Sequence, residues 1–480
     1  MIKSLGALLR QAAESDGSAV AFADGDSRLT YAQWDSRSDA AAAFFVEQGL
    51  VRGDVVALFL PMSIDYPIAY LGAAKAGLVT AGINTRYRSR EVAHILQSSG
   101  AAVLVTTKGE LRDLASSVAP EGLRAIIDPS SFRGEELTET PPPSPDDPVA
   151  IVYTSGTTGL PKGATYTHGC LEAIRRIEAA FGAQPRPRVL QAVPLPHMAF
   201  MTKIGSAIER RSFTVLMDRW SARGALEAIQ RERLTDSGGI PTQLSLMLME
   251  PSFGSHDLSS LRLLTLGGAP ATPDLVRQIR ESFRVPVAVR FSSTEIGLAT
   301  GTVPGDSDEV VATTVGRPLP EVDVRIAAAS GETGEILVRS PAMMTGYWRD
   351  AVATAASIDA DGFFHTGDVG WLGSDGNLRI TGRAKDMYIR GGYNVYPAEV
   401  EAVLREHPSV ALVAVVGVSD AVMGERGKAF IVPRSDAPSI DELREFLAER
   451  IADYKIPDEF EFRSELPLTA MFKIDKEALK

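Results

Sequence analysis

The side chains best suited to chemistry gather in residues 153–168, which read YTSGTTGLPKGATYTH. Three glycines there allow backbone N–H groups to turn inward and approach an anion closely: Gly156, Gly159 and Gly163. Four hydroxyl side chains add hydrogen-bond donors: Thr154, Ser155, Thr157 and Thr158. Lys162 adds a positive charge. This combination predicts a loop that binds a phosphate group.

The loop differs from the Walker A phosphate loop. That motif has Ser or Thr directly after its lysine, where it binds magnesium, whereas Gly163 follows Lys162 here. A solvated linker is the alternative interpretation of so many small polar residues. The apolar run IVY at 151–153 predicts a strand that leads into the loop, and the number of donors favours anion binding over a linker.

The elements that would hold this loop alternate between helices and strands. Helical spacing in 30–49 and 64–77 ends at a glycine in each case, and the short apolar runs DVVALFL and LVTAGIN follow as strands. The same scheme recurs at 90–107 and in the middle third of the chain. Such alternation predicts a mostly parallel sheet covered by helices.

The last third of the chain has a different character. From Val322 it becomes rich in strand-forming residues, with Asp-Gly turns suited to hairpins. After Arg383 follows a compact β-α-β-β-α pattern, and the joint falls near 382–387, GRAKDM. We therefore predict a large domain over 1–384 and a small domain over 385–480.

Composition limits the class of protein. The chain has 480 residues, too many for one core, and a net charge of -12, which argues against a nucleic-acid-binding protein. Its single cysteine, Cys170, excludes an internal disulfide and fits a reducing compartment. The N-terminus does not match a signal peptide, and no apolar run is long enough for a bilayer. We predict a cytoplasmic protein without a transmembrane segment.

At the loop, YTSGTTGLPKG resembles the phosphate-binding signature of the AMP-forming adenylate enzymes. This superfamily contains acyl-CoA synthetases, firefly luciferases and the adenylation domains of peptide synthetases. Further stretches follow in the family's order along nearly the whole chain: LTYAQWD, AAKAGLVTAGINTRY, LTLGGAP, FSSTEIG, GEILVRSPAMMTGYW, DGFFHTGDVG, ITGRAKDMYIRGGYNVYPAEVE and LPLTAMFKIDK. One such motif alone would be weak, but this many in sequence is typical of a member.

The resemblance implies an α/β fold with a large N-terminal domain of parallel-rich sheets covered by helices, a β-barrel-like part, and a small mobile α+β C-terminal domain. It also implies ATP-dependent activation of a carboxylic acid to acyl-AMP, then transfer to the thiol of CoA. ATP, Mg²⁺ and CoA are the implied cofactors and substrates, and the loop would hold the triphosphate. The first step brings two anions together, so it depends above all on charge stabilisation.

Residues that match the family's motifs take on its roles by resemblance. Lys473 matches the lysine that bridges the substrate carboxylate and the α-phosphate, with Lys476 as a structural neighbour. Glu295 matches the magnesium-binding glutamate, and Thr294 the phosphate contact beside it. Asp368 matches the ribose-binding aspartate, since a carboxylate can accept from both ribose hydroxyls. One further residue matches a ribose or phosphate contact: Arg383.

Two further groups concern adenine and the acyl chain. The family's adenine-side loop is matched by Gly268, Ala269 and Pro270. Phe291 stands where the family usually has a tyrosine, and its ring could stack on adenine. His197 matches a histidine beside the acyl pocket, for which we expect pocket lining and not acid–base catalysis. An apolar wall would follow it: Met198, Phe200 and Met201. Lys203 could meet a second carboxylate of a diacid, although a solvent-facing lysine is the more common role.

The family uses its small domain in two orientations. The hinge position corresponds to Lys385, and after rotation Arg390, Gly391 and Gly392 would face the thiol tunnel, where the glycines let pantetheine pass close to the backbone. Three positions depart from the pattern. Ser292 and Phe472 replace glycines, and Pro196 replaces an aromatic residue. A bulky residue at 472 would be strained if that position needs a positive φ.

Alternative functions remain on this scaffold. An acyl-AMP ligase that loads the phosphopantetheine of an acyl carrier protein shares the chemistry. An amino-acid adenylation domain usually carries an aspartate soon after PLPH, and MAFMTKIGS has none; nothing points to a luciferin. A non-catalytic nucleotide sensor is disfavoured because the charged residues are retained: Lys162, Glu295, Asp368, Arg383 and Lys473. RGGYNVYPAEVE is most typical of the acyl-CoA synthetases, and the acid itself is not identified.

Overall fold

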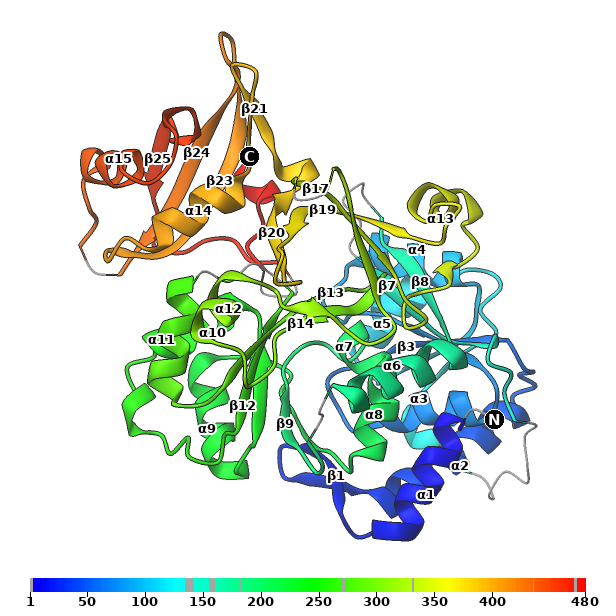
Figure 1. The fold of residues 1–480 in the computed structure, drawn as a ribbon. Helices are drawn as coiled ribbons and strands as arrows, with labels where there is room; N and C mark the ends of the chain where they lie inside the picture. Colours follow the sequence, from blue (N-terminus) through cyan, green and yellow to red (C-terminus); the bar gives the residue numbers. More distant parts are fainter. Residues whose placement is uncertain are drawn as a thin grey trace.

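Two parallel-rich sheets form the framework of the computed structural model, and a smaller lobe at the C-terminal end sits above them (Figure 1). The structure describes residues 3–133, 142–154, 160–181, 184–268, 271, 273–329, 332–434, 436–469 and 473–480. We call 385–480 the small domain and the rest the large domain. The boundary itself stays a prediction.

The nine-stranded sheet has the order β15-β14-β13-β12-β11-β9-β10-β1-β2. Its central strands, from β13 to β1, are parallel, and antiparallel strands lie at both edges. The strands are β1 (Val20–Asp24), β2 (Ser27–Thr30), β9 (Arg188–Gln191), β10 (Phe213–Leu216), β11 (Asp236–Gly239), β12 (Leu263–Gly267), β13 (Val287–Ser293), β14 (Gly297–Gly301) and β15 (Arg317–Pro318).

The seven-stranded sheet has the order β18-β8-β7-β4-β3-β5-β6 and is parallel from β7 to β6. The strands β3, β4 and β5 are buried at every residue, as expected where helices cover both faces of a parallel sheet. The strands are β3 (Val55–Phe59), β4 (Val79–Gly82), β5 (Ala101–Thr106), β6 (Ala125–Ile127), β7 (Pro148–Thr154), β8 (Lys162–Thr167) and β18 (Gly346–Tyr347).

Two further sheets follow along the chain. The β-rich part is a four-stranded antiparallel sheet of β16 (Asp323–Ala327), β17 (Gly334–Arg339), β19 (Phe364–Leu372) and β20 (Leu378–Arg383). The small domain has a five-stranded sheet of β21 (Tyr388–Arg390), β22 (Tyr393–Val395), β23 (Val410–Asp420), β24 (Gly424–Pro433) and β25 (Glu459–Phe462). With the two helices, its order is β-β-α-β-β-α-β, which contains the expected β-α-β-β-α pattern and adds β21 before it and β25 after it.

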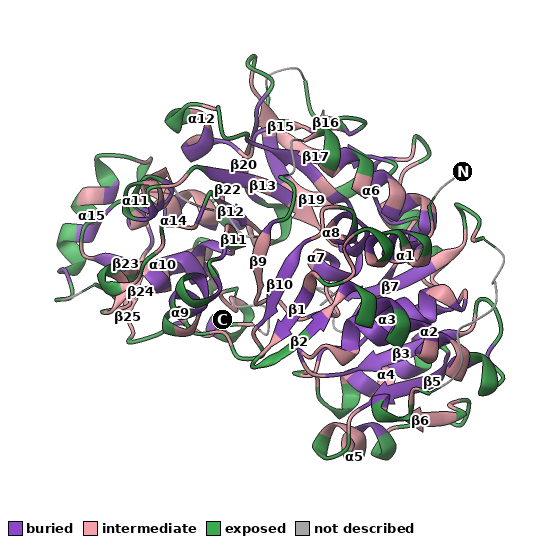
Figure 2. Ribbon diagram, turned by 90° about the horizontal axis from the view of Figure 1, so that it is seen from below, coloured by how far each residue is buried: buried purple, intermediate pink, exposed green. Residues whose placement is uncertain are grey.

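The helices lie on the outside of the sheets, so purple strands run through the centre of Figure 2 and green, exposed turns mark the outer faces. In the large domain they are α1 (Leu5–Asp16), α2 (Tyr31–Glu47), α3 (Asp65–Lys75), α4 (Ser89–Ser99), α5 (Glu110–Ser117), α6 (His168–Ala180), α7 (Met198–Met201), α8 (Ile204–Glu209), α9 (Ala222–Glu232), α10 (Pro241–Met249), α11 (Pro273–Phe283), α12 (Asp308–Thr313) and α13 (Ala351–Ser357). In the small domain they are α14 (Pro397–Arg405) and α15 (Ile440–Ala448). Short 3₁₀ turns include Ala384–Asp386.

Local signals explain where helices begin and end. The helix α2 begins with a capping box, in which the Thr30 side chain accepts from the Gln33 N–H and the Gln33 side chain accepts from the Thr30 N–H. The helix α4 ends at Gly100, whose left-handed φ of 65° a side chain would strain. The small domain has its own apolar cores, separate from those of the large domain.

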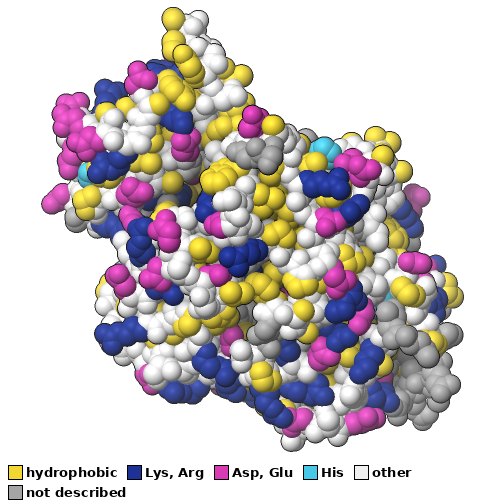
Figure 3. Space-filling model, in the orientation of Figure 1, with side chains coloured by type: hydrophobic (Ala, Val, Ile, Leu, Met, Phe, Trp, Pro, Cys, Tyr) yellow, Lys and Arg dark blue, Asp and Glu magenta, His cyan; other side chains and the backbone are white. Residues whose placement is uncertain are grey.

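These features confirm the predicted α/β class, with parallel-rich sheets in a large N-terminal part and a small α+β part at the C-terminus. Figure 3 shows the small domain as a separate lobe whose outer surface mixes acidic and basic side chains. In the part of the chain that the structure describes, we find no helix with the length and apolar character needed to cross a membrane.

Candidate functional site

The phosphate loop joins two antiparallel neighbours, β7 and β8, and its ends are held in register. Thr154 at the end of β7 pairs with Lys162 at the start of β8. The five residues Ser155, Gly156, Thr157, Thr158 and Gly159 lie outside the described residues, so their phosphate contacts stay predictions. The hairpin nevertheless brings a hydroxyl and an ammonium group to the same end of the seven-stranded sheet.

Lys162 lies beside an aromatic ring that the sequence interpretation missed. Its Nζ is 5.2 Å from the centre of the Tyr347 ring, and the hydroxyl of Tyr347 donates to Oε1 of Glu295 over 3.5 Å. Burial and the neighbouring charge of Glu295 raise the pKa of Tyr347, so the phenol stays protonated and acts as a donor. Tyr347 stands in the quoted GYW motif, which was the available signal for this residue.

Thr294 and Glu295 lie in the turn between β13 and β14, not at a helix start. The hydroxyl of Tyr166 on β8 donates to the carbonyl oxygen of Thr294 at 2.6 Å. The N–H of Met344 donates to the carbonyl oxygen of Glu295 at 2.9 Å. The backbone of this turn is therefore fixed to the strand that begins at Lys162.

Asp368 and Arg383 face each other across β19 and β20, where their Cα atoms are register partners. Arg383 Nε donates to Asp368 Oδ1 at 2.8 Å, and the Asp368 side chain is 15% exposed. Burial raises the pKa of Asp368 overall, although the charges of Arg383 and Lys473 oppose this increase. Asp368 is thus a carboxylate at the edge of the solvent, kept beside two cations.

Lys473 of the small domain reaches the large domain at this point. An ideal Cβ atom built on Gly268 would lie 3.8 Å from Cε of Lys473. Burial, followed by the charge of Arg383, lowers the pKa of Lys473, while the charges of Asp368 and Glu295 raise it. The structure therefore brings together Lys473, Asp368, Glu295, Arg383 and Gly268, which are far apart in the sequence.

His197 lies close enough to Lys473 for the charge of the lysine to act on its imidazole. It caps the N-terminus of α7, where its Nδ1 accepts from the Ala199 N–H at 3.2 Å. Burial, together with the charges of Lys473 and Lys203, lowers the pKa of His197 to about 3. A neutral imidazole fixed in this way suits the wall of a pocket. The three apolar residues expected after it are buried: Met198, Phe200 and Met201.

A solvent-facing side chain is the more common role of a lysine, but the side chain of Lys203 is paired with a carboxylate. Its Nζ lies 3.0 Å from Oε1 of Glu178 on α6, and the two side chains are 34% and 13% exposed. Burial favours a raised pKa for Glu178, but the charge of Lys203 beside it outweighs this effect and the pKa is lowered overall. The sequence does not single out Glu178, because this residue lies within α6 and outside the motifs used above.

Other predicted residues lie apart from this group. Arg390 pairs with Asp458 at 2.7 Å, and Gly391 and Gly392 form the β21–β22 turn with φ of 58° and 90°. This turn adjoins the tip of the β23–β24 hairpin, at the end of the small domain away from the large one (Figure 1). Both glycines adopt positive φ values, which glycine does without strain, but they do not face Lys473 in this arrangement.

The remaining predicted positions divide into three cases. Lys385 lies in a 3₁₀ turn beside Arg383, whose charge, after burial, lowers the pKa of Lys385. Phe291 is only 7% exposed and packs in the main core, so stacking on adenine stays a prediction. Three residues lie outside the described part of the chain: Ala269, Pro270 and Phe472.

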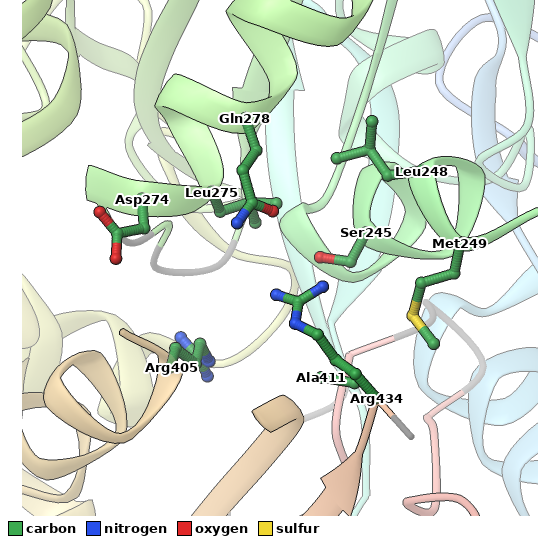
Figure 4. Close-up of a pocket in the computed structure, with 9 residues that line it drawn as sticks. All are labelled: Ser245, Leu248, Met249, Asp274, Leu275, Gln278, Arg405, Ala411 and Arg434. Carbon is green, nitrogen blue, oxygen red and sulfur yellow. The ribbon is translucent and has the colours of Figure 1, made fainter. Parts of the chain in front are cut away.

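A pocket at the joint between the domains is distinct from this group (Figure 4). Arg434 points between α10 and α11, and Arg405 lies near Asp274 (Figure 4). Burial and then Asp274 raise the pKa of nearby Glu406, so acidic groups of both domains meet here. The lining of the pocket mixes charged, polar and apolar side chains from both domains. The lining residues are Ser245, Leu248, Met249, Asp274, Leu275, Gln278, Arg405, Ala411 and Arg434.

The geometry can be compared with known proteins. Residues 9–348 match the family model described as AMP-binding enzyme, and residues 399–473 match the AMP-binding enzyme C-terminal domain. A feruloyl-CoA synthase from an Amycolatopsis species is 36% identical over 95% of this chain and 94% of its own length. The long-chain-fatty-acid–CoA ligase FadD13 of Mycobacterium tuberculosis is 31% identical over 100% of this chain and 98% of its own.

Solved structures agree with these matches. The ATP-bound crystal structure of MatB from Rhodopseudomonas palustris has a TM-score of 0.90 and 27% identity to this chain. The alignment covers 100% of this chain and 98% of MatB, so both domains contribute to it. The family model alone spans well over half of the sequence. The chain therefore belongs to the AMP-binding enzyme family.

Proposed function

We propose that this chain is an ATP-dependent acyl-CoA synthetase, which converts a carboxylic acid, ATP and CoA into acyl-CoA, AMP and pyrophosphate. The observation that supports this most directly is the approach of Lys473 to Asp368, Glu295 and Arg383 across the joint between the domains. An ammonium group beside a carboxylate that would bind ribose could stabilise an anhydride as it forms between the acid and the α-phosphate. Stabilisation of that charge is the main demand of the first step.

In the adenylation step, Lys473 would hold the substrate carboxylate against the α-phosphate. The carboxylate oxygen attacks the α-phosphorus, the bond to the pyrophosphate oxygen breaks, and pyrophosphate leaves. Lys162 and Thr154 would hold the departing phosphates, because they sit together at the mouth of the phosphate loop. Asp368 would orient the ribose, and the charge-assisted hydrogen bond from Arg383 favours the ionised form of its carboxylate.

Glu295 is the proposed protein ligand of Mg²⁺. No group of three or more His, Cys, Asp or Glu side chains within the described ranges could hold a metal ion. A single carboxylate suits Mg²⁺ that arrives with ATP, since this ion keeps several waters and usually binds one or two carboxylates plus phosphate oxygens. When bound, it would neutralise charge on the phosphates. The hydroxyl of Tyr347 would keep Glu295 directed towards Lys162.

The thioester step needs a second arrangement of the small domain. The thiol of CoA attacks the acyl carbon, AMP leaves, and the thiol proton passes to solvent. In the structure, Arg390, Gly391 and Gly392 lie away from Lys473, so they would reach the acyl-adenylate only after rotation about Lys385.

We further propose that the acid is an apolar monoacid. His197 is neutral, and the residues after it are buried and apolar. Lys203, the nearby candidate for a second carboxylate, is already neutralised by Glu178. The relatives are named for feruloyl and long-chain fatty acyl groups, which differ from each other, so the acid has to be found by experiment.

The test is pyrophosphate release with a panel of fatty, aryl and branched acids, followed by thioester detection with CoA or with an acyl carrier protein. We expect release with at least one acid and thioester formation with CoA. Transfer to the carrier protein alone would replace this proposal by a carrier-loading ligase. Absence of ATP binding and of pyrophosphate exchange with every acid would refute adenylate formation altogether.

A further inference from the structure

The helix α4 touches both ends of the phosphate loop. His94 Nε2 lies 2.9 Å from the carbonyl oxygen of Pro161, the residue directly before Lys162. Ser98 Oγ lies 2.9 Å from the hydroxyl of Tyr153, the residue directly before Thr154. His94 and Ser98 are four residues apart, so they lie on the same face of the helix. One helix face thus contacts the neighbours of both strand-end residues that form the mouth of the loop.

These contacts have defined chemistry. A carbonyl oxygen can only accept a hydrogen bond, so Nε2 of His94 must carry the proton in this contact. Proline has no N–H, and its carbonyl oxygen is therefore the only backbone hydrogen-bonding group through which Pro161 can be fixed. Tyr153 is only 7% exposed, and its hydroxyl is the polar end of an otherwise buried ring. Each contact gives a hydrogen-bond partner to the residue that precedes a loop-end residue: Pro161 before Lys162, and Tyr153 before Thr154.

The same helix is fixed to the segment that approaches Lys162 from the other side. Trp348 Nε1 donates to the carbonyl oxygen of Ser99 at 3.0 Å, and the Trp348 N–H donates to the carbonyl oxygen of Gly163 at 2.7 Å. Trp348 follows Tyr347, whose ring faces Lys162. The helix α4, the strand β8 and the GYW segment therefore form one connected support around the loop ends.

We propose that His94 and Ser98 are positioning residues for ATP, which hold Lys162 and Thr154 in register for the triphosphate. This inference rests on the proposed function of the loop. In this proposal neither His94 nor Ser98 touches the nucleotide. Each acts through the strand end that it contacts. Loss of either contact would let the mouth of the loop widen, which weakens binding of the phosphates more than binding of the acid.

The test compares four variants of the full chain: His94→Ala, His94→Gln, Ser98→Ala and, as a control, Gln97→Ala, which alters an exposed residue of the same helix. We expect His94→Ala to raise KM for ATP about two- to tenfold, the effect of one net hydrogen bond, with KM for the acid unchanged. His94→Gln should restore part of the loss, because its amide can donate to Pro161. ATP affinity by calorimetry should follow the same order.

The outcomes separate this inference from the proposed function. If wild-type protein neither binds ATP nor releases pyrophosphate, the proposed function fails. If wild-type protein binds ATP and His94→Ala binds it equally well, the positioning role fails while the function stands. Equal increases in KM for ATP and for the acid, together with a lower melting temperature, would also overturn the inference, because they indicate a general loss of stability.

Discussion

Arg383 Nε donates to Asp368 Oδ1 at 2.8 Å, and this pair lies at one end of the β19–β20 hairpin. A second pair, Arg379 and Asp375 at 3.0 Å, lies at the other end, near the turn. The two pairs have the same chemistry, yet only Asp368 lies beside Lys473. The hairpin therefore contains a candidate site residue and a matched control.

We expect Asp368→Ala to raise KM for ATP about tenfold or more, because a hydrogen bond to a charged group is worth about 1.5–3 kcal/mol. The preference of the wild type for ATP over 2′,3′-dideoxy-ATP should also disappear in this variant. Asp375→Ala should change neither value. Steady-state kinetics with both nucleotides measures this, and a nucleotide preference that survives in Asp368→Ala would exclude a ribose contact.

Lys473→Ala should reduce adenylation by about 10²–10³, the usual effect of removing one group that stabilises developing charge. Thioester formation from a supplied acyl-adenylate should stay largely intact, since Lys473 would leave the site when the small domain rotates. Separate assays of the two half-reactions measure this. Lys480→Ala, at an exposed lysine near the C-terminus, is the control, and equal loss in both half-reactions would contradict the assignment.

The neighbouring Lys476 has a different expected role. Its Nζ lies 2.6 Å from Oε1 of Glu401, whose side chain is 6% exposed. Arg405 would remain 3.6 Å from Oε2 of Glu401, so Lys476→Ala removes one of two charge partners and should lower the free energy of unfolding by about 1.5–3 kcal/mol. Urea unfolding measures this change. A Lys476→Ala protein of normal stability but without adenylation would reverse the roles of the two lysines.

Lys385→Pro should slow the thioester half-reaction about tenfold or more and leave adenylation nearly unchanged. The structure already has Lys473 at the site, and proline fixes φ near −65°, which would hinder the rotation of the small domain. Lys385→Ala, which keeps the backbone free, is the control. Normal thioester formation in the proline variant would argue against a hinge at this position.

Glu178→Gln should change the preference among acids. The substitution removes the carboxylate that lies 3.0 Å from Lys203 and neutralises it. Lys203 then stays as an unneutralised cation near His197. We expect kcat/KM for a dicarboxylic acid to rise relative to that for the monoacid of the same length. Glu172→Gln on the same helix, whose partner Arg175 lies 2.6 Å away, is the control. An unchanged ratio would show that Lys203 does not face the acyl group.

His168 should make the protein sensitive to acid. Burial lowers the pKa of His168 to about 4, although Asp147 raises it, and an unfolded histidine titrates near 6.5. The unfolded state thus binds more protons between these values, so stability falls as pH decreases from about 6.5 to about 4. The contribution is up to about 1.4 kcal/mol per pH unit. Urea unfolding of His168→Asn should show a flatter pH dependence than wild type, and an identical one would contradict this.

Much of the fold follows from local sequence. The glycines at 49, 77 and 100 end helices, and the apolar runs after them become buried parallel strands, as expected. The phosphate loop was predicted because its hydroxyls, glycines and lysine are adjacent in the chain. Motif order likewise identified the family, which the match over 9–348 confirms.

The site was only partly predictable. The individual residues Asp368, Glu295 and Lys473 were chosen by resemblance, and their roles stay proposals. Glu178 and His94 were missed, since a glutamate and a histidine on ordinary helices give no local signal, whereas Tyr347 was missed although it stands in the quoted GYW motif. Their importance arises from contacts between segments that are distant in sequence, such as His94 with Pro161.

By itself, then, the sequence determined the residue types gathered in the predicted phosphate loop and the order of the elements, because neighbouring residues and hydrophobic periodicity specify both. The tertiary structure decided which charges meet: Lys473 with Asp368, Lys203 with Glu178, and Arg390 with Asp458 away from the site. The physical reason is that electrostatic effects depend on distance and burial in space. Those are set only when separate sheets and domains pack against one another.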